Sequence, residues 1–125
     1  MMIRISSAES LIMEALWSKS PMAAEEVVAQ VAAAQGWSEA TVKTLLNRLL
    51  KKRAIAAVKD GRRYLYRPLT QRETYVNAES QGLLDRLFDG RLAPLVSHFS
   101  QNGKLSAADI AELKRLIEEI DDERA

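Results

Sequence analysis

Ser38–Pro68 (SEATVKTLLNRLLKKRAIAAVKDGRRYLYRP) is the stretch that decides the fold. Its first half has apolar residues at the three- and four-residue spacing of one helical face, and polar or basic residues on the other face. Two short runs follow, Ile55–Lys59 and Arg62–Arg67, joined by Asp60-Gly61, a dipeptide that is preferred in two-residue hairpin turns. The stretch therefore predicts an amphipathic helix followed directly by a β-hairpin.

The predicted helix, Ser38–Lys52, has short hydrogen-bonding groups and long cations on the face opposite its apolar side. Between Lys43 and Arg67 the chain has nine basic residues and one acid, a local charge of +8 in a protein of net charge +1. Side chains of these types bind base edges and phosphates of DNA. We expect the helix and hairpin to be the recognition helix and wing of a DNA-binding winged helix-turn-helix domain. The expected DNA-binding residues are Ser38, Thr41, Lys43, Thr44, Asn47, Arg48, Lys51, Arg62, Arg63 and Tyr64.

Two further helices are predicted before this stretch. Residues 6–9 (SSAE) match a capping box, in which the serine and the glutamate satisfy free backbone N–H groups. A second helix is expected from about Ala23 to Gln35, ended by Gly36. The apolar residues that the first helix is expected to bury are Leu11, Ile12, Leu16 and Trp17.

The net charge and the pattern of apolar residues change after residue 70. Residues 1–70 have 11 basic and 6 acidic side chains, whereas residues 71–125 have 7 and 11, so the net charge changes from +5 to −4. Helical patterns cover Gln71–Asp89, a short segment around residues 92–99, and a last segment capped by Ser106. We therefore expect a mainly α protein with a DNA-binding domain at 1–70, which includes a two-stranded wing, and a three-helix domain at 71–125.

The three C-terminal helices have more apolar residues than so small a unit can bury by itself. A second copy of the chain would cover them, and a two-fold symmetric dimer suits a DNA site of dyad symmetry. The alternative is that these helices pack back onto the first domain. The residues expected at the dimer interface are Leu83, Leu84, Leu87, Phe88, Leu92, Leu95, Phe99, Ile110, Leu113, Leu116, Ile117 and Ile120.

The composition argues against several other kinds of site and function. The chain has no cysteine, which excludes disulfides and thiolate metal sites. His98 is the only histidine, and one histidine is too few for a zinc site. No nucleophile and base are placed for catalysis, so we expect no enzyme activity, no catalytic residues, no cofactor and no metal. No apolar stretch approaches the length of a membrane span, and we expect a cytoplasmic protein without direct membrane insertion.

Several segments resemble one known family, the penicillinase-repressor (BlaI/MecI/CopY) family of winged-helix repressors. The resemblance spans nearly the whole chain in the expected order. Its segments are Trp37–Leu49 (WSEATVKTLLNRL), Lys59–Leu69 (KDGRRYLYRPL), Leu84–Gly90 (LDRLFDG), Leu92–Val96 (LAPLV) and Glu112–Leu116 (ELKRL).

The resemblance implies a homodimeric repressor that binds double-stranded operator DNA of dyad symmetry and blocks transcription of a β-lactamase-type or related stress-response gene. In the β-lactam branch, a membrane sensor protease releases the operator by cleaving the repressor at an Asn-Phe bond. The corresponding bond here is His98-Phe99, so a histidine replaces the asparagine. The copper-responsive branch has a C-terminal cysteine cluster, which this chain lacks.

A winged helix can also have a second class of function. Such domains also serve as protein-interaction modules without sequence-specific DNA binding. These modules do not need concentrated positive charge on the third helix and hairpin, which this chain has. Retention on heparin or DNA, and its dependence on salt, distinguishes the two functions.

Overall fold

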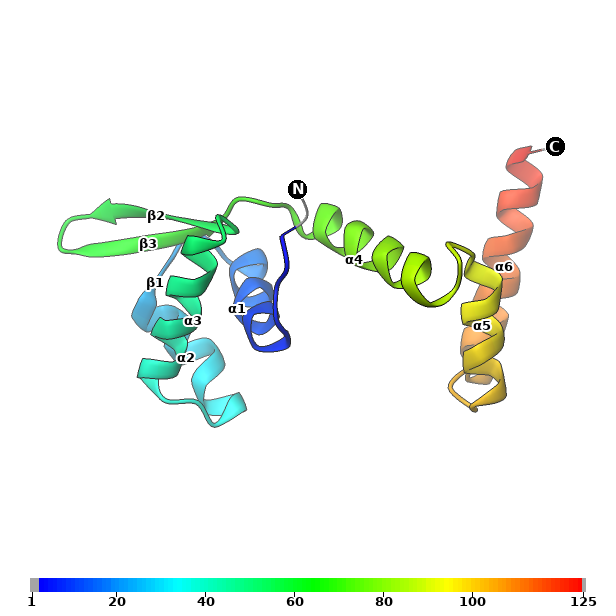
Figure 1. Ribbon diagram of the computed structural model, residues 1–125, viewed down its shortest axis with the longest axis horizontal. Helices are drawn as coiled ribbons and strands as arrows, with labels where there is room; N and C mark the ends of the chain where they lie inside the picture. The colour runs from blue at the N-terminus through cyan, green and yellow to red at the C-terminus, as the bar shows by residue number, and fades with distance from the viewer. Residues whose placement is uncertain (1–2, 125) are drawn as a thin grey trace. The chain divides into compact units, whose positions relative to one another are not determined.

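The computed structural model describes residues 3–124, and the chain forms two compact units, the first ending at Ala78 and the second beginning at Glu79. Figure 1 shows the order of the elements along the chain. Their bounds are α1 Ser7–Ser18, β1 Met22–Ala23, α2 Ala24–Gln35, α3 Glu39–Lys51, β2 Ile55–Asp60, β3 Arg63–Pro68, α4 Arg72–Leu87, α5 Leu92–Gln101 and α6 Ala107–Arg124.

The predicted helix boundaries are confirmed where capping residues set them. The Ser6 side chain accepts a hydrogen bond from the Glu9 N–H, and the Glu9 carboxylate accepts one from the Ser6 N–H, which completes the capping box of α1. Ser38 caps α3 by accepting from the Thr41 N–H. Gly36 ends α2 with a φ of 70°, a left-handed conformation that glycine adopts without a steric penalty.

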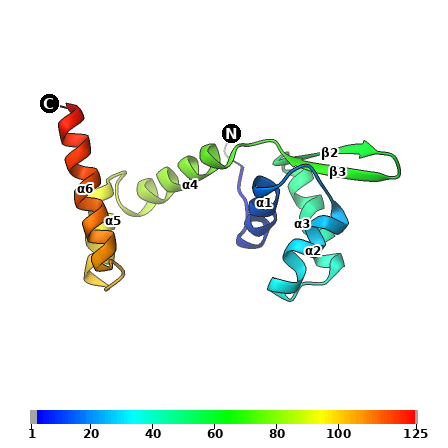
Figure 2. The same ribbon diagram turned by 180° about the vertical axis from the view of Figure 1, so that it is seen from behind.

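The wing is part of a three-stranded antiparallel sheet with the order β1-β3-β2. In Figures 1 and 2 the β2–β3 hairpin projects beyond the three helices of its unit. Asp60 pairs with Arg63, so the two loop residues are 61 and 62, one position later than predicted. Only the first of them, Gly61, has a positive φ (64°), as in a type II′ turn. The third strand, β1, pairs with β3 and was not predicted from the sequence.

The core of the first unit is built by the inner faces of α1, α2 and α3 together with the sheet. The prediction that α1 buries Ile12 and Leu16 is confirmed, but Leu11 is 37% exposed. The prediction for Leu11 was wrong because Met13 and Ala15 occupy inward positions of α1 instead. Trp17 is half-buried against this core. The buried face of α3 consists of Val42, Leu45, Leu46 and Leu49.

The second unit contains the end of α4 and the helices α5 and α6, and residues of α5 and α6 line one groove. The sharp bend after α4 places Asp89 and Gly90 at φ values of 51° and 74°, and the Gly90 N–H donates to the Leu84 carbonyl. Across this bend, the rings of Phe88 and His98 have centroids 6.2 Å apart. No helix within residues 3–124 is both long and apolar enough to cross a membrane.

Candidate nucleic-acid interface

The outer face of α3 presents every DNA-binding residue that the sequence predicted for it. Because α3 turns four apolar side chains into the core, its opposite face is forced toward solvent. Ser38 and Thr41 lie at its N-terminal end, where their hydroxyl oxygens are 3.0 Å apart. The residues exposed at this face are Ser38, Thr41, Lys43, Thr44, Asn47, Arg48 and Lys51.

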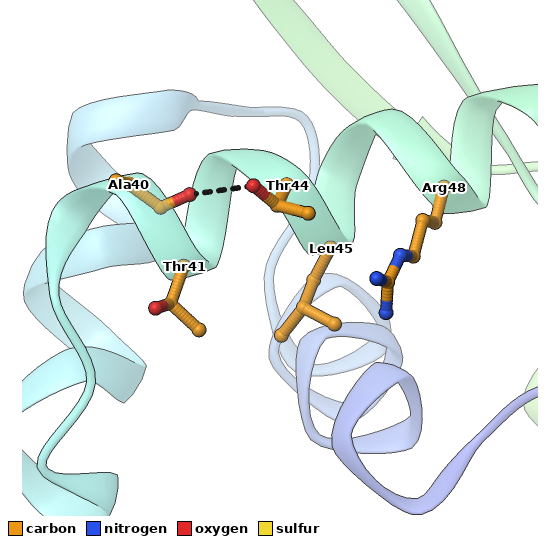
Figure 3. A pocket seen from close by; sticks show the side chains of 5 residues that line it. All are labelled: Ala40, Thr41, Thr44, Leu45 and Arg48. Atoms are coloured by element: carbon orange, nitrogen blue, oxygen red, sulfur yellow. Dashed lines mark hydrogen bonds between the residues drawn. The ribbon is translucent and has the colours of Figure 1, made fainter.

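A shallow hollow of about 260 Å³ lies along one side of this face. Figure 3 shows Thr41, Leu45 and Arg48 projecting from the same side of α3. The Thr44 hydroxyl donates to the Ala40 carbonyl at 3.0 Å, so its proton is held by the helix backbone. The hollow therefore combines methyl and methylene surface with one guanidinium group, the types of group that contact thymine methyls and guanine edges.

The basic side chains of α3 differ in whether a carboxylate pairs with them. Lys43 forms a salt bridge of 3.0 Å with Glu39, one helical turn earlier, and both side chains are more than half exposed. Within residues 3–124, Arg48 and Lys51 have no salt-bridge partner. An unpaired cation loses no intramolecular contact when it meets a phosphate or a guanine. Arg48 and Lys51 are therefore the cations of α3 that are best prepared for DNA.

Lys52, directly after α3, has a structural partner that sequence reasoning missed. Its ammonium group lies 2.5 Å from a carboxylate oxygen of Glu9, whose side chain is almost fully buried. Burial alone raises the pKa of Glu9, but the hydrogen bonds from Lys52 and Ser6 outweigh it, so this pKa is lowered. The contact fixes the C-terminal end of α3 to the first turn of α1. Only the capping box at Glu9 was visible in the sequence.

The wing presents Arg62, Arg63 and Tyr64 at its exposed tip, as predicted. Arg63 has two acidic neighbours, Glu25 at 3.8 Å and Asp60 at 3.6 Å, and all three side chains are more than half exposed. Such long contacts between exposed groups are weak and can exchange for a phosphate. Arg62 has no salt-bridge partner among the described residues and is the freer cation of the wing tip.

The residues predicted for the dimer interface all belong to the second unit, whereas those predicted for DNA binding all belong to the first. None of them is fully buried within the chain. His98 and Phe99 lie in the last turn of α5, with both side chains exposed. Among the side chains that the structure describes, no group of three or more His, Cys, Asp or Glu could hold a metal ion.

Comparison with known proteins agrees with this arrangement. Residues 5–119 match the family model described as penicillinase repressor. A penicillinase repressor of Bacillus licheniformis is 34% identical over 93% of this chain and 91% of its own length. A penicillinase repressor of Staphylococcus aureus is 29% identical over 94% of both chains.

A solved structure of a relative matches part of this chain. The monomeric form of Bacillus licheniformis BlaI in complex with the blaP half-operator is 33% identical and superposes with a TM-score of 0.53. The match covers 60% of this chain and 92% of that one. The winged-helix fold, the cationic outer face of α3 and the match over residues 5–119 have one common explanation. This chain belongs to the penicillinase repressor family.

Proposed function

We propose that this protein is a transcriptional repressor that binds operator DNA of dyad symmetry as a homodimer. The observation that carries the proposal is the outer face of α3, which is polar and cationic over its whole length while its inner face is buried. In this proposal α3 enters the major groove, and the wing contacts the neighbouring backbone. The relative solved with the blaP half-operator supports DNA as the partner of the first unit.

The two cationic parts of the interface have different tasks. Arg48, beside the hollow on α3, contacts a base edge, whereas Arg63 on the wing contacts phosphate. An arginine that binds guanine through two hydrogen bonds discriminates between bases by about 1–3 kcal/mol. A phosphate contact adds affinity for every sequence and makes binding more dependent on salt.

The test uses Arg48→Ala and Arg63→Ala in the full chain. The specific probe is a duplex that the wild-type protein enriches from a random-sequence library. A duplex of scrambled sequence measures non-specific binding. Arg48→Ala should lose about 1–3 kcal/mol of discrimination between the two. Arg63→Ala should weaken both alike and reduce the slope of log affinity against log salt by about one. Equal small effects of both substitutions would refute these assignments.

Dimerisation through the second unit is the other half of the proposal. The apolar side chains of α5 and α6 line a groove of about 770 Å³, and none of the described residues of α4, α5 or α6 is buried. Burying such a surface against an identical copy gives a two-fold assembly, in which two recognition helices meet two half-sites. Sedimentation of the full chain at micromolar concentration should show a dimer.

The proposal also includes the regulated gene and the release step. The two relatives named above are penicillinase repressors, and we infer a β-lactamase-type or related stress-response gene as the target. A membrane sensor protease would release the operator by cutting His98-Phe99. This bond precedes α6, so the cut would remove the apolar stripe of α6 and leave α3 intact.

Mass spectrometry of protein isolated from induced cells tests the release step. A fragment whose C-terminal residue is His98 is the expected result. Intact protein that nevertheless leaves the operator would show that another signal controls it.

A further inference from the structure

The start of α4 is fastened to α1 by three contacts of different kinds. The Arg72 Nε–H is shared between the two carboxylate oxygens of Glu14, at 3.0 and 3.1 Å. The Trp17 indole N–H donates to the Thr70 carbonyl at 2.8 Å. The rings of Trp17 and Tyr75 have centroids 5.5 Å apart with a tilt of 36°. We call these three contacts the α1–α4 latch.

The latch is anchored in the core that also positions the recognition helix. Trp17 is half-buried and packs against the cluster of α1, α2 and α3 side chains that includes Leu16 and Leu46. The Glu14–Arg72 pair lies outside this cluster, with both side chains about half exposed. One end of the latch therefore moves with α3, while the other end is the first turn of α4.

The helix that begins at the latch does not stop at the boundary of the first unit. α4 is one unbroken helix from Arg72 to Leu87, and the boundary between the units falls inside it, between Ala78 and Glu79. A continuous helix is a rigid element that can transmit a constraint from one end to the other. The latch adds side-chain contacts to the covalent connection that the loop between β3 and α4 provides.

We propose that Glu14, Trp17 and Arg72 are positioning residues that restrict the spacing of the two DNA half-sites that the protein accepts. By fixing the start of α4 to α1, the latch limits the orientations in which a dimer can present its two recognition helices. A dimer of this kind gains avidity only where both half-sites can be engaged together. This inference rests on the proposed binding of a dyad-symmetric operator by a homodimer.

The experiment varies the distance between the two half-sites and measures the affinity. If the latch only stabilised the fold, breaking it would not change how the affinity depends on this distance. The duplex is the one enriched by the wild-type protein from a random-sequence library, with and without about five base pairs inserted between its half-sites. This insertion rotates one half-site by about half a helical turn relative to the other. A duplex with a single half-site measures the DNA contact alone.

The test variant is Arg72→Glu in the full chain, which places two carboxylates opposite each other at the latch. Lys19→Glu is the matched control, since it makes the same change in charge at an exposed position one residue after α1. Glu14→Arg combined with Arg72→Glu restores an ion pair of reversed polarity. Thermal unfolding of each variant checks that the fold is retained.

The insertion should weaken binding of the wild type and Lys19→Glu by about 100-fold, through loss of simultaneous engagement. Arg72→Glu should lose less than about tenfold on insertion, and its affinity for the single half-site should stay within about twofold of the wild type. For the double variant, the insertion should again weaken binding by about 100-fold.

Two outcomes would overturn the inference. An Arg72→Glu variant with the full insertion penalty would refute the latch alone and leave the proposed function standing. A wild-type protein that binds both duplexes equally, and sediments as a monomer, would refute the latch together with the dimeric repressor.

Discussion

The two units of this chain differ in what their apolar side chains contact. Every buried hydrophobic residue that the structure describes lies in the first unit, between Ile12 and Ile55. In the second unit, large apolar side chains such as Leu92 and Ile117 are 60% and 57% exposed. A unit with its own core can hold its shape alone, whereas one with an open apolar surface needs a partner. This difference supports the proposal that the first unit recognises DNA and the second assembles the dimer.

The largest effect on dimerisation and DNA affinity is expected from a charge placed on the exposed apolar surface of the second unit. Ile117→Glu adds a charge to an already exposed position of a single chain, but buries that charge in the proposed dimer. The variant should sediment as a monomer and bind the enriched dyad duplex about 10²–10⁴-fold more weakly, with unchanged affinity for a half-site.

The matched control is Leu11→Glu, at an exposed apolar position of α1 in the first unit. It should leave the dimer and the affinity for the dyad duplex intact. A dimeric Ile117→Glu protein would contradict the assignment of assembly to α6.

The next prediction compares how the unfolding of each unit depends on protein concentration. Leu46 is 1% exposed, and Leu46→Ala should reduce the free energy of unfolding of the first unit by about 2–5 kcal/mol. Leu113 is half-buried in α6 and should belong to an apolar interface that only the proposed dimer completes. Calorimetry at two protein concentrations should separate the two unfolding transitions. The midpoint temperature of the transition that Leu113→Ala changes should rise with concentration, and that of the transition that Leu46→Ala changes should stay constant. A Leu46-dependent transition that also moves with concentration would break the comparison.

A smaller effect is expected from the buried carboxylate of the first unit. The folded protein lowers the pKa of Glu9 below its ordinary value of 4.5, so this group stabilises the fold at neutral pH. That stabilisation is lost as the pH falls from about 4.5 through the lower folded-state pKa. Glu9→Gln should cost about 1.5–3 kcal/mol at pH 7, the usual contribution of a hydrogen bond to a charged group.

The measurement is denaturant unfolding of both proteins between pH 7 and pH 3. The difference in free energy of unfolding between wild type and Glu9→Gln should shrink with acidification. A difference that is constant over this range would mean that the charge of Glu9 does not contribute.

These contrasts explain which features could be predicted from the sequence. The two faces of α3 are set by residues three and four positions apart, so local periodicity revealed both the buried Leu45 and the exposed Arg48. The caps at Ser6 and Ser38 are equally local. The absence of a core in the second unit could be anticipated because its helices are few and amphipathic.

The features that escaped prediction depend on residues far apart in the sequence. β1 has only two residues, too few for alternation, and it exists because Met22 pairs with Tyr66. The Lys52–Glu9 pair joins positions 43 residues apart, so the sequence shows Lys52 only as one of nine basic residues and not as the partner of Glu9. The latch between Glu14 and Arg72 spans 58 residues for the same reason. Periodicity contains no information on such pairs.

The smallest predicted effect is that of removing a single exposed ion pair on the salt dependence of DNA binding. It tests whether the cations that bind DNA belong to the first unit alone. Glu39 forms an ion pair with Lys43 on the outer face of α3, and an exposed pair of this spacing is worth about 0.3–0.5 kcal/mol to stability. Glu39→Gln should therefore barely change the free energy of unfolding. It should free Lys43 for a phosphate and steepen the slope of log affinity against log salt by up to about one.

The matched control for Glu39→Gln lies in the second unit. Glu119→Gln removes a comparable exposed carboxylate, which lies 2.8 Å from Arg115 at the same four-residue spacing on α6. Because α6 is assigned to assembly, this substitution should leave the salt slope of DNA binding unchanged. Titrations of both variants at four or more salt concentrations measure the two slopes. Equal changes of slope would mean that cations of the second unit also meet the DNA, and recognition would then no longer belong to the first unit alone.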